Sequence, residues 1–335
     1  MSAEENSDLT TAVTRARRAT QPPAMPPVSL RVRLSTTPWL HRLMPAPLAI
    51  RRAERRGAEN WERYPDERQR ARAAMEAIVA GTERAHQAEE LSRQYMIESE
   101  VHRMLFWRPL RTARMAEKSE AHLHDALEAG RGVLLSSCHT GPIFQTMSVI
   151  AARGRGAFCV AAPWFFEQPS HDQWGRRLAR WWQVARARRE HVIPSVGSYP
   201  VLRLLLEQRE LVWLLFDMPG SRETHFLGKP IMVSSSSARL ASETQALILP
   251  LRSRREGHRT WVDVGAPLDP STYADVEDLH DALAAVHERW ILDLPATLED
   301  PRRRGAWEER ATASGWTRPA SARVGGAGQR RGLTA

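Results

Sequence analysis

Residues 130–144 read GRGVLLSSCHTGPIF. The short apolar run at 133–138 predicts a buried strand, and Pro142 suits the first turn of a helix that begins directly after it. His139 therefore falls at the carboxyl end of a strand, where open α/β sheets bind their ligands. The stretch predicts a sheet strand that delivers an imidazole to the start of a helix.

The same alternation of strand and helix continues along the chain. Apolar strands are predicted at 132–138, 157–162, 211–216 and 246–251, and amphipathic helices at 118–130, 142–154, 198–210 and 235–245. Short strands that are apolar throughout and separated by helices indicate a buried, largely parallel sheet. The predicted fold class is α/β: a mostly parallel central sheet covered by helices on both faces, with an N-terminal helical layer.

The two ends of the chain differ from its middle. Both ends are polar or rich in small residues and have no hydrophobic period, which predicts disorder. The segment 65–81 begins at a Pro-Asp pair and places Met75, Ile78 and Val79 on one helical face. The predicted organisation is a disordered tail (1–28), a helical region (29–117), an α/β domain (118–312) and a disordered basic tail (313–335).

The net charge of +9 favours anionic partners such as phospholipid headgroups, a phosphorylated cofactor, an acidic carrier protein or nucleic acid. All but two of the 48 basic residues are arginine, a bidentate partner for phosphate, although a codon bias toward arginine explains the same count. Nucleic acid is not the expected partner, because the arginines are scattered and no nucleic-acid-binding signature occurs. Two cysteines are too few for a disulfide framework, and no apolar run reaches the roughly 18 residues of a membrane span. The absence of a signal-peptide pattern predicts a cytoplasmic location.

His139 has two interpretations. It is a general base, with the free N–H groups near Gly141 at the start of the next helix stabilising an anion in the same crevice, or it is a histidine that satisfies its hydrogen bonds locally. A nucleophilic thiol at Cys138 paired with His139 is excluded, because successive side chains of a strand point to opposite faces. Cys138 is expected to be a small buried hydrophobe. No P-loop or dinucleotide-binding glycine motif occurs, and the histidines show no metal-ligand spacing.

Three blocks carry a resemblance to a known family. They are residues 130–144, residues 216–251 (FDMPGSRETHFLGKPIMVSSSSARLASETQALILPL) and residues 261–269 (WVDVGAPLD). In this order the sequence resembles the lysophospholipid and lipid A biosynthesis (lauroyl/myristoyl) acyltransferase superfamily, in particular its phosphatidylinositol mannoside acyltransferase-like branch. The resemblance covers about residues 45 to 295.

The resemblance implies transfer of a fatty acyl group from acyl-CoA or acyl carrier protein to a hydroxyl of a membrane glycolipid or phospholipid. No cofactor other than the acyl donor and no metal is implied. His139 matches the family's general base, which an acid that follows it after four intervening residues normally orients. That position holds Phe144. Asp217, at the end of the predicted strand 211–216, is the first substitute, although a helix-cap or turn role explains it equally well. The weaker substitutes are Glu167, Asp172 and Gln145.

The resemblance also points to residues that hold substrate. Gly141 would contribute to the oxyanion site, and Arg222, His225 and Lys229 of the turn at 220–230 would hold phosphates. Arg239, on the small-residue helix, would face the same crevice. Cations on exposed loops are common, so a simply solvated role is the alternative for all four charged side chains.

Two segments suggest contact with an anionic membrane surface. Residues 171–190 place tryptophans and arginines on separate helical sides, and residues 36–57 are apolar at first and basic at the end. The first is equally typical of a helix packed on the core. The predicted location is peripheral, at the cytoplasmic face of the cell membrane, with residues 29–117 membrane-proximal.

Two alternatives to lipid acylation stay open. The chain is a catalytically degenerate homologue that binds lipid or a partner, or it acylates an amine or a natural-product alcohol. A degenerate homologue predicts no carboxylate within hydrogen-bond reach of His139, whereas a repositioned acid predicts that one is present.

Overall fold

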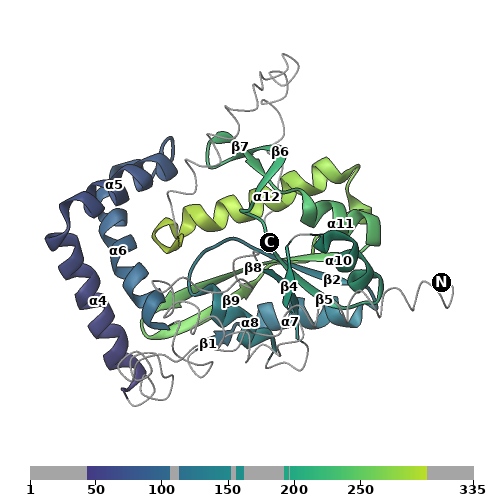
Figure 1. Cartoon of the computed structure of the whole chain (residues 1–335), viewed down its shortest axis with the longest axis horizontal. Helices are drawn as coiled ribbons and strands as arrows, with labels where there is room; N and C mark the ends of the chain where they lie inside the picture. Colours follow the sequence, from purple (N-terminus) through teal and green to yellow (C-terminus); the bar gives the residue numbers. More distant parts are fainter. Residues whose placement is uncertain (1–43, 106–112, 152–155, 162–191, 196, 300–335) are drawn as a thin grey trace.

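The computed structural model describes residues 44–105, 113–151, 156–161, 192–195 and 197–299 (Figure 1). A seven-stranded sheet forms its centre, with the strand order β1-β9-β8-β2-β5-β3-β4. The strands are β1 (Ala113–Met115), β2 (Val133–Ser137), β3 (Phe158–Ala161), β4 (Val192–Pro194), β5 (Leu211–Leu215), β8 (Leu247–Glu256) and β9 (Arg259–Val264). The five strands from β8 to β4 are mutually parallel, and the antiparallel pair β8–β9 reverses the direction at one side. This confirms the predicted α/β class.

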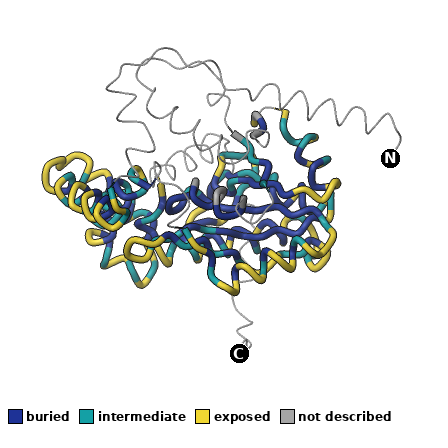
Figure 2. Tube along the Cα trace, turned by 90° about the horizontal axis from the view of Figure 1, so that it is seen from below, coloured by how far each residue is buried: buried dark blue, intermediate teal, exposed yellow. Residues whose placement is uncertain are grey.

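Helices cover both faces of the sheet (Figure 1). On one face lie α10 (Ser198–Glu207), α11 (Ser236–Thr244) and α12 (Val276–Asp293), and on the other lie α7 (Glu117–Glu128) and α8 (Ile143–Ala151). Strand residues alternate between the two cores: Leu134 belongs to the α10–α12 side and Leu135 to the α7–α8 side. Figure 2 shows the buried strands as a continuous layer with exposed residues at its rim.

The N-terminal layer consists of α4 (Ala46–Arg63), α5 (Pro65–Val79) and α6 (Ala88–Leu105), with the short 3-10 helix η1 (Ala85–Gln87) between α5 and α6. The predicted face of α5 is confirmed, since Met75, Ile78 and Val79 are fully buried in the core on the α10–α12 side. Helix α4 lies against α6 so closely that a Cβ on Gly57 would lie 2.5 Å from the Cα of Ile97. The sheet begins earlier than expected, because β1 pairs with β9 although it falls within the region predicted as helical.

Several elements of the C-terminal half were not predicted. A separate hairpin of β6 (Pro219–Phe226) and β7 (Lys229–Val233) follows β5, and β9 and α12 complete the C-terminal part. The 3-10 helices η6 (Pro270–Thr272) and η7 (Pro295–Thr297) flank α12. The predicted tails, and the predicted interfacial helix at 171–190, lie outside the described residues. In the part that is described, no helix has the length and apolar character to cross a bilayer.

Candidate active site

His139 and Asp217 meet at the carboxyl edge of the sheet. The Nδ1 atom of His139 lies 2.8 Å from Oδ1 of Asp217, and the backbone N–H of His139 donates to Oδ2 of the same carboxylate at 3.0 Å. The Asp217 side chain is fully buried, whereas that of His139 is 12% exposed. One carboxylate therefore fixes both the ring and the main chain of the histidine. This is the contact that the hypothesis of a repositioned acid predicted.

Strand register explains why these two residues meet. β2 and β5 are parallel neighbours, and Ser137 pairs with Leu215. His139 and Asp217 each lie two residues beyond this pair. The amide of Phe216 donates to Ser137 O at 2.7 Å, so the pairing continues past the last regular strand residue. Two side chains at equal distance beyond paired strand ends emerge side by side.

Cys138 takes no part in this pair. Its side chain is buried in the core beneath α10–α12, which agrees with the prediction of a small buried hydrophobe. Burial, reinforced by the negative charge of Asp217, raises the pKa of the thiol well above its ordinary value. The thiol stays protonated and is not a nucleophile.

The backbone after His139 is held by the residues that follow α12. His139 O accepts from the amide of Glu299 at 2.7 Å, and the amide of Gly141 donates to Thr297 O at 2.7 Å. Gly141 has φ +61°, and a Cβ there would lie 2.0 Å from Ser253 O. The expectation that the Gly141 amide stabilises an oxyanion is therefore wrong for this conformation, because that N–H is already bound to a carbonyl.

The other proposed partners of His139 lie elsewhere. Gln145 is buried in α8, and its Nε2 donates to Leu105 O at 3.4 Å. Phe144 is the second residue of α8. Glu167 and Asp172 lie outside the described residues. Asp217 is thus the carboxylate that the structure brings to the histidine.

The cations of the β6–β7 hairpin divide into two groups. Arg222 forms ion pairs with α12, at 3.0 Å to Glu277 and 3.7 Å to Asp281. Its charge is balanced within the fold, which argues against the predicted phosphate contact. His225 and Lys229 are exposed near the hairpin turn, where Phe226 pairs with Lys229 in the register.

Arg239 does not join His139. Its guanidinium stacks over the ring of Tyr199 with 5.1 Å from Cζ to the ring centroid, and it lies 3.8 Å from Glu243 one helical turn later. The Tyr199 hydroxyl donates to the same glutamate at 2.9 Å. The expectation that Arg239 faces the crevice is wrong, because these contacts hold it between α10 and α11.

Two buried histidines of α12 were missed by the sequence analysis. The Nε2 atom of His287 lies 3.0 Å from Ser136 Oγ, and that of His280 lies 2.7 Å from Thr224 Oγ1. Both rings pack against Phe216, the residue before Asp217. Burial lowers both pKa values to about 4, so the rings are neutral at pH 7. The apolar period after the N-cap Asp275 is the signal that predicts α12 from the sequence.

The fold and this site define the class of the protein: an α/β protein with a buried carboxylate holding a histidine at the sheet edge. The family model for bacterial lipid A biosynthesis acyltransferase matches residues 36–297. Because this match covers most of the chain, the protein belongs to that family and is an acyltransferase. The family assignment agrees with the superfamily that the sequence blocks resemble.

Among the solved structures that are similar is that of the 1-acyl-sn-glycerophosphate (LPA) acyltransferase PlsC from Thermotoga maritima. The two sequences are 15% identical, and the match covers 64% of this chain and 83% of the other, with a TM-score of 0.38. None of the curated proteins matches this sequence.

Proposed function

We propose that the protein moves a fatty acyl group from an acyl thioester, acyl-CoA or acyl carrier protein, to a hydroxyl of a membrane glycolipid or phospholipid. His139 acts as the general base and Asp217 as its carboxylate partner. The observation that carries this proposal is the pair of hydrogen bonds from His139 to one buried carboxylate. The phosphatidylinositol mannoside acyltransferase-like sequence blocks favour a glycolipid acceptor.

The geometry supports a different role for each nitrogen of the ring. With Nδ1–H donated to Asp217, Nε2 is the basic nitrogen and accepts the proton of the acceptor hydroxyl. The hydroxyl oxygen then forms a bond to the thioester carbonyl carbon and gives a tetrahedral oxyanion. When the C–S bond breaks, the thiolate takes the proton from the imidazolium, which yields an ester and a free thiol. Asp217 stays ionised throughout and stabilises the imidazolium.

The contact at Asp217 also weighs against the degenerate alternative. An inactive homologue has no need for a fully buried carboxylate, which costs several kcal/mol of desolvation unless it is well paired. Here the carboxylate is hydrogen-bonded to the backbone N–H and to the ring Nδ1 of His139, so the buried charge orients the histidine. An acyl acceptor that is an amine or a natural-product alcohol is compatible with the same base.

The test is acyl transfer with labelled acyl-CoA and acyl carrier protein donors, offered to membrane lipid extracts and to soluble alcohols and amines. The native chain should label a lipid, and His139→Gln should abolish labelling. His258→Gln, at an exposed histidine in the turn between β8 and β9, is the matched control and should retain most of it. If the native chain labels no acceptor yet binds membranes, the binding role replaces the catalytic one.

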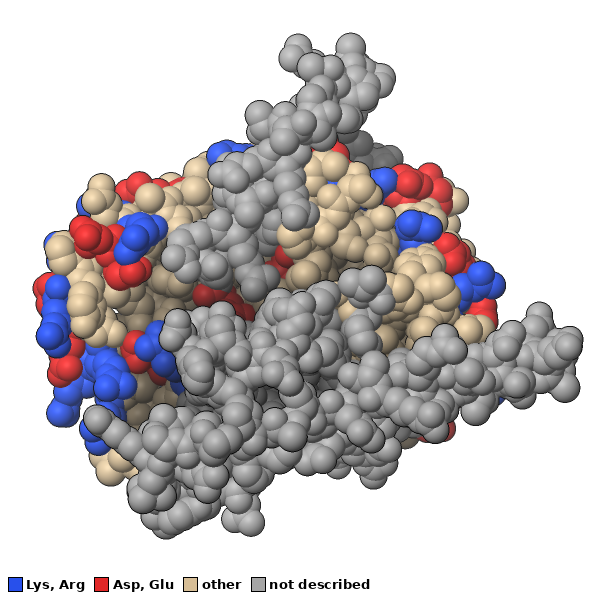
Figure 3. Space-filling model, in the orientation of Figure 1, with Lys and Arg blue, Asp and Glu red and all other residues tan. Residues whose placement is uncertain are grey.

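We also infer that α4 lies against an anionic membrane at the cytoplasmic face. Its exposed face carries Arg51, Arg52, Arg55 and Arg56, and Figure 3 shows basic side chains gathered along the edge where α4 lies. None of these four arginines forms an ion pair with another described residue. Leu48, 56% exposed, lies one turn before them on the same face. A basic helix face with an apolar residue suits anionic headgroups above an acyl layer.

Binding to vesicles tests this surface. Each arginine near an anionic surface contributes about 1 kcal/mol, so replacing the four by glutamine should weaken binding by on the order of a hundredfold or more. Arg70 and Arg72 of α5 are already paired with glutamates, and their glutamine variants are the control. Unchanged binding of the fourfold variant, with lost binding to acyl carrier protein, would assign the face to the carrier instead.

A further inference from the structure

The main chain of His139 is held at its carbonyl by residues 297–299, here named the strap, in addition to its contact with Asp217 at the amide. The strap pairs with the segment after β2: Thr140 and Leu298 form an antiparallel bridge, and both Glu299 N–H and Gly141 N–H make hydrogen bonds of 2.7 Å across it. Leu298 is buried in the core beneath α10–α12. The strap therefore fixes the position of the backbone at His139, where the chain leaves the sheet.

The strap follows α12 closely in the chain and is hydrogen-bonded to the end of that helix. Thr297 is bound to Leu294 O through both its amide and its hydroxyl, so it moves with the last turn of that helix. Two arginines hold this turn from different elements. Arg84 Nη1 donates to Leu292 O at 3.0 Å and to Asp293 O at 2.6 Å, and Arg252 Nη1 lies 3.4 Å from Trp290 O and 3.2 Å from Asp293 Oδ2.

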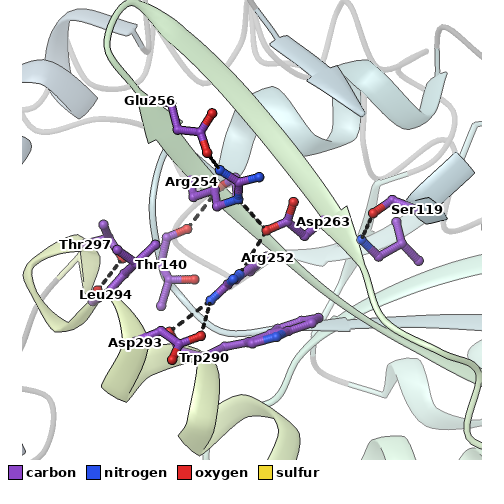
Figure 4. Close-up of polar contacts among 12 residues, drawn as sticks. Ser119, Thr140, Arg252, Arg254, Glu256, Asp263, Trp290, Asp293, Leu294 and Thr297 are labelled. Atoms are coloured by element: carbon purple, nitrogen blue, oxygen red, sulfur yellow. Dashed lines mark hydrogen bonds and ion pairs between the residues drawn. The ribbon is translucent and has the colours of Figure 1, made fainter. Parts of the chain in front are cut away.

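Arg252 lies where β8 passes the His139 segment (Figure 4). Its Nε donates to Asp263 of β9 at 3.1 Å, and its guanidinium stacks over Trp290 with 5.2 Å from Cζ to the ring centroid. The next residue, Ser253, points to the opposite face of β8 and donates its hydroxyl to Thr140 O at 3.1 Å. Of these two consecutive residues, Ser253 therefore contacts the segment that carries His139, and Arg252 contacts β9 and the end of α12.

We propose that Arg252 is a positioning residue for His139, which it serves through the end of α12 and the strap. This inference rests on the proposed role of His139 as the base. Arg252 does not need to contact substrate for this role. Its planar guanidinium links the Asp263 carboxylate on β9 to the C-terminal turn of α12. The helix carbonyls at that turn carry the partial negative charge that a cation stabilises.

Arg254 provides a matched control. It lies two residues along the same strand, is similarly buried, and donates to the same oxygen of Asp263 at 2.6 Å. Its other contacts are Glu256 and the ring of Trp261, and none of them lies on α12. A variant of Arg254 therefore disturbs the same pair of strands, β8 and β9, and the same partner, Asp263, while it leaves the contacts of the strap in place.

The experiment compares Arg252→Gln with Arg254→Gln in two measurements on the full chain. Hydrogen exchange of peptides that contain the Gly141 and Glu299 amides should be about tenfold faster in Arg252→Gln, which equals roughly 1.4 kcal/mol of lost protection. In acyl transfer, the same variant should lose about tenfold or more in kcat with KM within about twofold. Arg254→Gln should match the native chain in both.

Three results would overturn the inference. They are unchanged exchange in Arg252→Gln, equal acceleration in both variants, and a rise of KM alone, which would place Arg252 in substrate binding. Exchange does not depend on turnover. A native chain without activity therefore counts against the proposed function, and the exchange of the two amides still decides whether Arg252 holds the strap.

Discussion

Replacing Asp217 by asparagine keeps the shape of the side chain and removes its charge. In the native chain one carboxylate oxygen faces the Nδ1–H of His139 at 2.8 Å and the other accepts the backbone N–H at 3.0 Å. Asparagine offers one oxygen and one NH2 group, so one of these two donors must face another donor. Asp217→Asn therefore loses both the ionic partner of the imidazolium and one hydrogen bond.

The magnitude follows from these two losses. A hydrogen bond to a charged group is worth about 1.5–3 kcal/mol, and leaving a buried donor unsatisfied costs about 1–3 kcal/mol. Together they give roughly 2.5–6 kcal/mol, and at about 1.4 kcal/mol for each factor of ten the expected loss in kcat/KM is about 10²- to 10⁴-fold. This range matches the usual contribution of general base catalysis.

The assay is single-turnover acyl transfer with a labelled thioester, combined with thermal unfolding of each variant. Asp281→Asn removes an exposed carboxylate of α12 and is the control. Because Asp217 is fully buried, a large fall in Tm would signal a damaged fold and not a lost base. Retention of kcat/KM within about threefold, in a variant that unfolds at the native temperature, would refute the assignment of Asp217 as the partner of His139.

Three further outcomes are expected. Gly141→Ala should lower stability by about 1–3 kcal/mol or more and reduce transfer, since its Cβ would meet Ser253 O; thermal unfolding and the transfer assay check this. The buried histidines of α12, His280 and His287, have pKa values of about 4, against about 6.5 when unfolded, so the unfolded chain binds more protons between these values. Urea unfolding should show stability falling as the pH is lowered from about 6.5 to about 4, and His280→Asn should flatten the slope. Arg131 lowers the pKa of Asp269, so this ion pair stabilises the fold above about pH 3.9, the ordinary pKa of an aspartate. Arg131→Gln should therefore lower Tm at pH 7, and the difference in Tm should shrink as the pH falls below about 3.9.

The local features of the fold could be predicted from the sequence. Around His139, a glycine, a short apolar run and a proline define a strand and the helix after it within 15 residues. The buried face of α5 follows in the same way from the spacing of Met75, Ile78 and Val79. These predictions succeed because backbone conformation and local periodicity decide them, and neither depends on distant residues.

The roles of the charged residues could not be predicted in this way. Arg222 was expected to bind phosphate, but it pairs with Glu277, which is 55 positions later on a helix that was not predicted. Arg239 was expected to face the crevice, but Tyr199, 40 positions earlier, holds it. A solvated arginine and an ion-paired one have the same local sequence, because only the packing of remote elements supplies the partner.

The carboxylate partner of His139 was predictable in part: its residue type and its place after a strand are local features, but its contact with His139 depends on a remote strand. The family motif places its acid after four residues that follow the histidine in the same chain segment, and that position holds Phe144. The sheet provides a second kind of spacing. When two parallel strands are paired in register, residues that lie the same number of positions beyond the paired ends come close together. Ser137 pairs with Leu215, and adding two residues to each gives His139 and Asp217. An acid that directly follows a neighbouring strand can therefore replace an acid on the helix without any change in the position of the base. No local pattern contains the identity of the strand beside β2, and it is this pairing that distinguishes Asp217 from the other candidate acids.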